Sequence, residues 1–176
     1  MKKTLVVNLI GGPGVGKSTL AAHIFALLKE QKVDCELITE FAKDLVWEQR
    51  SETFKDEVYV FAKQNHKLFR LNGKVDVVIT DSPLIQVCFY GKGENELCAL
   101  VKKEVNRYNN LNILLTRKTE YDSNGRNQTE EEARSIDNEM KSILDESKMN
   151  YEILPGESNT ANIIVTKVLN WLKENK

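Results

Sequence analysis

The sequence predicts a single α/β domain of three layers, in which helices cover both faces of a parallel five-stranded sheet. Short β-branched and apolar runs alternate with segments of helical periodicity along the whole chain. The sequence contains no repeat, low-complexity tract or linker that would divide this alternation. Its length of 176 residues corresponds to about one domain with a core of its own.

The first half of the chain contains three predicted strands and three predicted helices. The first strand, TLVVNLI, is apolar almost throughout, as expected for a strand that is covered on both faces. The longest helix is predicted from an apolar repeat that includes Phe54, Val58, Phe61 and Leu68. In chain order, the predicted elements are strand 4–10, helix 17–31, strand 35–39, helix 41–48, helix 53–71 and strand 75–80.

The second half continues the alternation around one polar segment. Residues 117–132 lack a core pattern, and Thr129 followed by Glu132 matches a capping box that starts the next helix. The other predicted elements are helix 96–108, strand 111–116, a helix from about 129 onward, strand 151–155 and helix 160–174.

Composition and charge bear on whether the protein binds nucleic acid or membranes and on the compartment in which it works. The formal net charge of −1 provides no long-range attraction to nucleic acid or to an anionic membrane. The longest apolar runs are far shorter than the roughly 20 residues that span a bilayer, and the start of the chain lacks a signal-peptide pattern. Cys35, Cys88 and Cys98 are widely spaced, so we expect buried free thiols in a reducing, cytoplasmic protein.

A phosphate-binding motif lies between the first strand and the first helix. Gly11-x-x-x-x-Gly16-Lys17-Ser18 fits G-x-x-x-x-G-K-[S/T] at every fixed position. Backbone N–H groups of such a loop surround the phosphates, Lys17 reaches the β- and γ-phosphates, and the Ser18 hydroxyl binds Mg²⁺. The predicted nucleotide-contacting residues are Gly11, Gly12, Pro13, Gly14, Val15, Gly16, Lys17, Ser18 and Thr19.

The remaining strand ends favour a small kinase among nucleotide-binding proteins. A GTPase would show an Asn/Thr-Lys-x-Asp motif after a later strand, where this chain has RKTEYD. A motor ATPase normally closes a longer strand with paired carboxylates and adds sensor elements. Here a single Asp81 ends the run VVIT.

With these residues assembled, the chain resembles the P-loop nucleoside and nucleotide kinases. It looks most similar to nicotinamide riboside kinase domains and related phage ATP-binding proteins. The resemblance implies strand order 2-3-1-4-5, ATP and Mg²⁺ as cofactors, a helical region that holds a small-molecule acceptor, and an arginine-bearing lid at about 117–132. The chain departs from deoxynucleoside and thymidylate kinases, which usually place an arginine directly after the third-strand carboxylate. Ser82-Pro83 occupies that place here.

The resemblance also implies roles for single residues. Glu40, at the end of the second strand, takes the place of the carboxylate that accepts the proton of the substrate hydroxyl. Asp81 takes the place of the acidic residue that supports Mg²⁺. Arg126 is the leading lid cation, with Arg117 and Arg134 in reserve. Independently of the resemblance, carboxylates at the carboxyl ends of parallel strands lie where ligand sites form in α/β proteins.

The acceptor site is predicted to lie against the helix 53–71. Gln64 is a candidate contact to a base or sugar, although an exposed helical face explains it equally well. Asp44, one helical turn after Glu40, can share or replace its role. Phe41 and Trp47 can stack on a base or belong to the core.

Three functions remain open from the sequence. The first is transfer of the ATP γ-phosphate to a hydroxyl of a nucleoside, nucleotide or related small molecule. The second is a kinase that acts on a hydroxymethylated base in DNA, with a phosphate backbone following lysines and arginines that flank the site. The third is a regulatory ATPase without a phosphate acceptor. The sequence does not determine the oligomeric state, and a homodimer is one of the possibilities. In the second function, the basic residues that would contact the DNA backbone are Lys63, Lys67, Arg70, Lys74, Lys102, Lys103 and Arg107.

Overall fold

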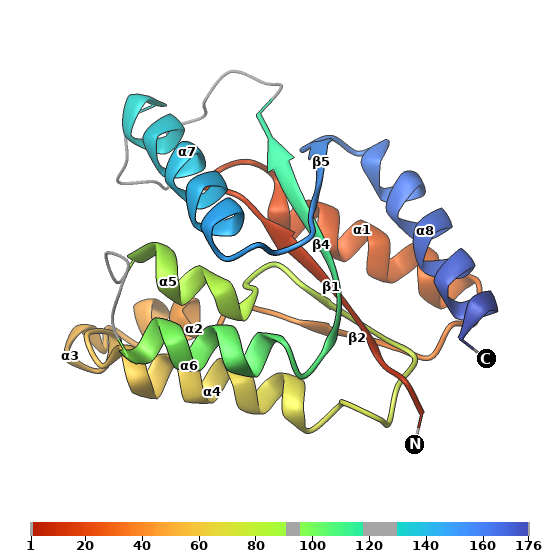
Figure 1. Ribbon diagram of the computed structural model, residues 1–176, viewed down its shortest axis with the longest axis horizontal. Helices are drawn as coiled ribbons and strands as arrows, with labels where there is room; N and C mark the ends of the chain where they lie inside the picture. The colour runs from red at the N-terminus through yellow and green to blue at the C-terminus, as the bar shows by residue number, and fades with distance from the viewer. Residues whose placement is uncertain (1, 91–95, 118–129, 176) are drawn as a thin grey trace.

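The computed structural model describes residues 2–90, 96–117 and 130–175, which form a three-layer α/β structure (Figure 1). Its five strands lie in one sheet in the order β2-β3-β1-β4-β5, and every neighbouring pair is parallel. Both the architecture and the strand order agree with the prediction. The strands are β1 (Leu5–Ile10), β2 (Cys35–Ile38), β3 (Val77–Thr80), β4 (Asn109–Thr116) and β5 (Glu152–Pro155).

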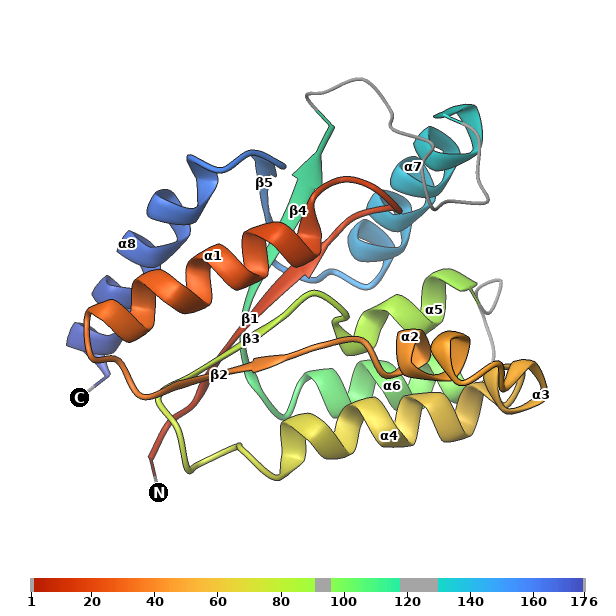
Figure 2. The ribbon, with the colours of Figure 1, turned by 180° about the vertical axis from the view of Figure 1, so that it is seen from behind.

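Helices cover both faces of this sheet. On one face, α1 (Lys17–Glu30) and α8 (Thr160–Glu174) pack side by side (Figures 1 and 2). On the other face, α4 (Glu57–Phe69), α6 (Glu96–Val105) and α7 (Glu130–Glu146) share an apolar core with β1, β3 and β4. The shorter helices are α2 (Phe41–Trp47), α3 (Ser51–Phe54), the 3₁₀ helix η1 (Leu84–Gln86) and α5 (Val87–Tyr90). Within the described ranges, none of the helices combines the length and the apolar character that crossing a membrane requires.

The helix predicted over 53–71 is two helices, α3 and α4. Asp56 caps the start of α4, because its carboxylate accepts a hydrogen bond of 3.0 Å from the backbone N–H of Tyr59. The interruption turns the first part of the expected apolar face outward. Phe54 is 49% exposed and Val58 is 60% exposed, whereas Phe61 is buried as predicted.

The prediction of three free thiols is wrong for two cysteines. Cys88 and Cys98 form a disulfide, with their Cα atoms 5.2 Å apart. Packing of α5 against α6 brings these residues together, a tertiary contact that their spacing in sequence does not reveal. Cys35 is buried and free, as expected. The expectation of a reducing compartment was based on three free thiols, and the disulfide removes that basis.

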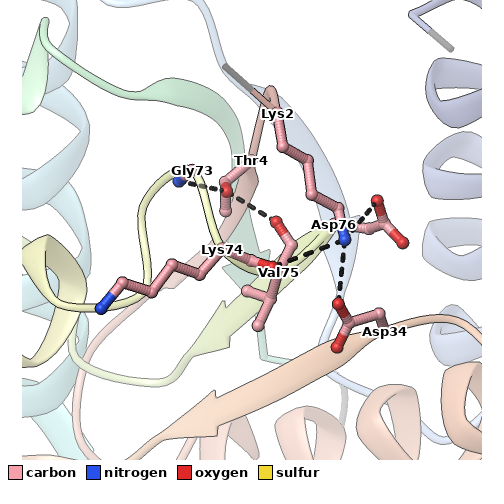
Figure 3. A network of polar contacts seen from close by, with 7 residues as sticks. All are labelled: Lys2, Thr4, Asp34, Gly73, Lys74, Val75 and Asp76. Atoms are coloured by element: carbon pink, nitrogen blue, oxygen red, sulfur yellow. Dashed lines mark hydrogen bonds and ion pairs between the residues drawn. The ribbon is translucent and has the colours of Figure 1, made fainter.

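A polar network fixes the amino-terminal ends of three strands (Figure 3). The Lys2 ammonium lies 2.9 Å from an oxygen of Asp34 and 3.1 Å from one of Asp76, which precede β2 and β3. The buried Thr4 hydroxyl donates to the carbonyl of Val75 at 2.6 Å and accepts from the N–H of Gly73 at 2.8 Å. These contacts hold the end of the sheet opposite the glycine-rich loop, which follows the carboxyl end of β1.

Candidate nucleotide and acceptor site

The glycine-rich loop connects β1 to α1 and requires its glycines for two physical reasons. Gly14 and Gly16 have φ angles of 79° and 92°, in the left-handed region that side chains disfavour. A Cβ at Gly11 would lie 2.7 Å from Cγ1 of Val15 and 3.3 Å from the carbonyl oxygen of Leu115. The loop is thus tightly folded against the sheet, with Gly16 at the amino terminus of α1.

Lys17 folds back over this loop. Its ammonium donates to the carbonyl oxygens of Gly11 at 2.6 Å and Gly12 at 2.9 Å. Burial lowers the pKa of the Lys17 ammonium, and the negative charges of Glu40 and Asp81 oppose that shift. The lysine therefore lies within electrostatic reach of both carboxylates that the sequence singled out.

Ser18 and Asp81, the two residues predicted to hold Mg²⁺, are in contact. The Ser18 hydroxyl donates to one carboxylate oxygen of Asp81 at 2.5 Å. The other oxygen, Oδ1, is buried and has no hydrogen-bond partner among the described residues. A hydroxyl beside a carboxylate with one unpaired oxygen fits the oxygen-donor preference of Mg²⁺. No group of three or more His, Cys, Asp or Glu residues that could hold a metal occurs in the described part of the chain, so phosphate and water oxygens would complete the coordination.

Glu40 is the second residue after β2, at the amino terminus of α2, and is half-buried. Burial raises the pKa of its carboxyl, the nearby charge of Lys17 opposes this shift, and the charge of Asp81 adds to it. A carboxyl group whose pKa is raised by burial beside a cationic phosphate loop is a candidate proton acceptor. The structure thus brings Glu40, Lys17 and Asp81 into one site.

Gln64 connects the ends of two neighbouring strands. It is 5% exposed, and its Oε1 accepts from the N–H of Phe41 at 3.0 Å. Its Nε2 donates to the carbonyl of Ser82 at 3.1 Å. These bonds tie the segment that carries Glu40 to the segment that carries Asp81. Gln64 therefore supports the geometry of the site, and the expected contact with substrate stays a prediction.

Aromatic and basic side chains gather beside Glu40. The ammonium groups of Lys63 and Lys67 lie 6.0 Å and 5.7 Å from the centroid of the Phe41 ring, which also packs edge-on against Tyr59. Lys67 lies 3.6 Å from a carboxylate oxygen of Asp44. Asp44 is thus engaged with a lysine on α4, and its substrate role also stays a prediction.

Trp47 was expected either to stack on a base or to lie in the core. It is 78% exposed, so the core alternative is wrong. Its position at the end of α2 places it six residues beyond Phe41.

Sequence reasoning missed Asp137 on α7. Its Oδ1 accepts a hydrogen bond of 2.8 Å from the backbone N–H of Gly12, in the phosphate loop. Its Oδ2 lies 2.7 Å from Nε of Arg117, the residue that follows β4. No sequence pattern distinguishes Asp137, because it lies in a charged helix, 125 positions from Gly12. Arg126, the leading lid candidate, and residues 118–129 of the expected lid lie outside the described residues, as does the side chain of Arg134.

Gly156 also belongs to the site. Its N–H donates to the carbonyl of Thr116 at 2.9 Å, and a Cβ at this position would overlap the carbonyl oxygen of Val15. The segment after β5 therefore presses directly on the phosphate loop. A glycine that follows the last predicted strand was the available signal.

Comparison with known proteins identifies the family of the chain. A family model described as an AAA domain matches residues 6–161. The chain belongs to this family. This AAA domain is a P-loop NTPase with a kinase-like fold. No curated protein sequence matches it.

Solved structures show the same fold. The crystal structure of a thymidylate kinase from Ehrlichia chaffeensis superposes with a TM-score of 0.56 over 97% of this chain and 99% of that one. The two sequences are 15% identical, so the likeness concerns the fold.

Proposed function

We propose that this AAA domain is an ATP-dependent phosphotransferase that moves the γ-phosphate to a hydroxyl of a nucleoside, nucleotide or related small molecule. The observation that carries the proposal is the placement of Glu40. A half-buried carboxyl with a raised pKa lies within electrostatic reach of Lys17 and Asp81, at the same edge of the sheet as the phosphate loop.

In the proposed reaction, the hydroxyl oxygen of the acceptor forms a bond to the γ-phosphorus. The bond from that phosphorus to the β–γ bridging oxygen breaks, and ADP leaves with the electron pair. Glu40 accepts the proton of the hydroxyl. Amides of the loop and Lys17 stabilise the charge on the phosphate oxygens. Mg²⁺ held by Ser18 and Asp81 would supply further neutralisation of that charge.

The site favours an alcohol over a phosphate as the group that attacks. A phosphate monoester is largely ionised near pH 7, because its second pKa is about 6, so it needs no protein base. An alcohol does need one, and burial tunes the Glu40 carboxyl toward that task. A nucleotide would accordingly be phosphorylated on a hydroxyl.

A second candidate is a kinase for hydroxymethylated bases in DNA. The cluster of Phe41, Tyr59, Lys63 and Lys67 favours it, because aromatic rings and cations together bind single-stranded nucleic acid. The cluster lies beside Glu40, the proposed general base. A nucleotide extruded from DNA would have to bring its hydroxyl to this residue. Salt-dependent retention of DNA separates this candidate from a small-molecule kinase.

The proposal is tested by a transfer screen with ATP labelled on the γ-phosphate. Acceptors are nucleosides, nucleotides, nicotinamide riboside and DNA that contains hydroxymethylpyrimidines. We expect label on one of these classes and none with Lys17→Ala. Lys29→Ala is the matched control, because Lys29 lies on the same helix with its ammonium over the Phe25 ring. ATP turnover that no acceptor alters would contradict the proposal and support a regulatory ATPase.

A further inference from the structure

One carboxylate joins two parts of the phosphate site. Oδ1 of Asp137 accepts from the backbone of Gly12, and Nε and Nη2 of Arg117 donate to the same carboxylate at 2.7 Å and 3.3 Å. The guanidinium side chain is 7% exposed and that of Asp137 is 23% exposed. In both ribbon views α7 approaches the turn between β1 and α1 (Figures 1 and 2).

We propose that Asp137 is a positioning residue that holds the guanidinium of Arg117 against the phosphate loop, where it acts on the transferred phosphate. The proposal rests on the proposed function above. It assigns Arg117, which the sequence placed only in reserve, as the cation that faces the phosphates. The α7 helix then provides a fixed support for the loop.

Geometry supports a positioning role in preference to a simple surface ion pair. Exposed ion pairs contribute little and orient little, because water screens them and both side chains stay mobile. Here the guanidinium is buried and held through two of its nitrogens, an arrangement that fixes its plane. The carboxylate is held in turn by a backbone amide of the loop itself. Gly12, Asp137 and Arg117 are thus joined by hydrogen bonds into one unit.

Hydrogen bonds place Arg117 close to Lys17. Asp137 joins the guanidinium of Arg117 to the backbone N–H of Gly12, whose carbonyl accepts from the Lys17 ammonium at 2.9 Å. The positive charges of Lys17 and Arg117 repel each other at this loop, and the triphosphate of ATP relieves that repulsion. Before ATP binds, the carboxylate of Asp137 offsets part of the positive charge.

The proposal predicts that one substitution slows transfer without weakening the binding of MgATP. Asp137→Asn keeps an oxygen that can accept from Gly12 and removes a negative charge from the phosphate site. MgATP should bind as tightly as to the wild type or more tightly. The transfer rate kcat should fall about 10- to 100-fold, because misplacement of a catalytic group by about 1 Å costs rates of that order. A residue that only stabilised the fold would not tighten binding while it slowed transfer.

The test combines kinetics of the full chain with a double-mutant cycle. We expect Arg117→Lys to lower kcat, and Asp137→Asn to add little in the Arg117→Lys background. Asp145→Asn is the matched control on α7, because it removes an exposed pair with Lys141 and should leave kcat unchanged. Wild-type kcat in Asp137→Asn, or independent and multiplicative losses in the double variant, would overturn the proposal.

A second readout needs no acceptor. In nuclear magnetic resonance spectra, Asp137→Ala should shift the amide of Gly12 and the Nε–H of Arg117 together, with no loss of the folded spectrum. Unchanged resonances would overturn the coupling even if the wild type transfers phosphate. If both resonances shift but the wild type phosphorylates no acceptor, the link from Gly12 through Asp137 to Arg117 is supported and the proposed function is contradicted.

Discussion

Replacement of Gly156 by alanine tests how closely the segment after β5 supports the phosphate loop. The new Cβ would overlap the carbonyl oxygen of Val15 and lie 3.4 Å from its Cγ2. Because the φ angle of Gly156 is outside the left-handed region, the substitution introduces steric overlap without backbone strain. The loop must move for the methyl group to fit.

The expected magnitude follows from the cost of inserting a methyl group into a packed contact, about 1–3 kcal/mol. If the displaced loop must regain its conformation to bind phosphates, this cost reduces ATP affinity about 5- to 150-fold, since 1.4 kcal/mol is tenfold. The assay is a titration with MgATP by calorimetry, with the melting temperature measured in parallel.

Gly73→Ala is the control for this prediction. Gly73 has a φ angle of 80° and lies at the opposite end of the sheet, where its nearest neighbour beyond the adjacent residues is the carbonyl oxygen of Lys2, 3.8 Å from the position of a Cβ. Alanine there should cost about 1 kcal/mol of stability through backbone strain and leave ATP affinity unchanged. Wild-type affinity in Gly156→Ala, or equal losses of affinity in the two variants, would refute the reasoning.

Three further predictions concern the thiols, the far end of the sheet and the proposed base. Without reductant, alkylation of the unfolded chain followed by mass spectrometry should label Cys35 and leave Cys88 and Cys98 unlabelled. In the folded protein Cys35 should resist alkylation at pH 8, because burial raises its pKa to about 11, and rapid labelling would contradict its burial. Thr4→Val should lower the free energy of unfolding in urea by about 1–3 kcal/mol, because the buried carbonyl of Val75 and the half-buried N–H of Gly73 lose their hydrogen bonds. ATP affinity should be unchanged. The transfer rate should fall as the pH drops through the raised pKa of Glu40, since this carboxyl must be deprotonated to accept a proton. If Glu40→Gln keeps the same dependence of rate on pH, another group is responsible for it.

The fold could be predicted because its signals are local. Each strand of a parallel sheet with two covered faces is a short apolar run, and each helix between strands carries its own periodicity. The break between α3 and α4 was missed because Asp56 interrupts an apolar repeat that otherwise continues from Phe54 to Leu68. A single capping side chain outweighed the repeat.

The site could be predicted in part for the same reason. Gly11 to Thr19 form a contiguous motif, and Glu40 and Asp81 follow predicted strands whose parallel arrangement brings them to one edge. Asp137 and Gly156 were missed because their roles depend on contacts with residues more than a hundred positions away. The disulfide was missed because the packing of α5 and α6 determines it.

The most direct test of the account is a single-turnover measurement on Glu40→Gln with the acceptor that the transfer screen identifies. Phosphate transfer and the Kd of MgATP are determined for the variant and the wild type under the same conditions. Loss of a general base predicts a transfer rate about 10²- to 10⁴-fold lower, with a Kd within about twofold of wild type because the phosphate loop is untouched. Transfer at the wild-type rate would contradict the assignment of Glu40 as the group that faces the acceptor.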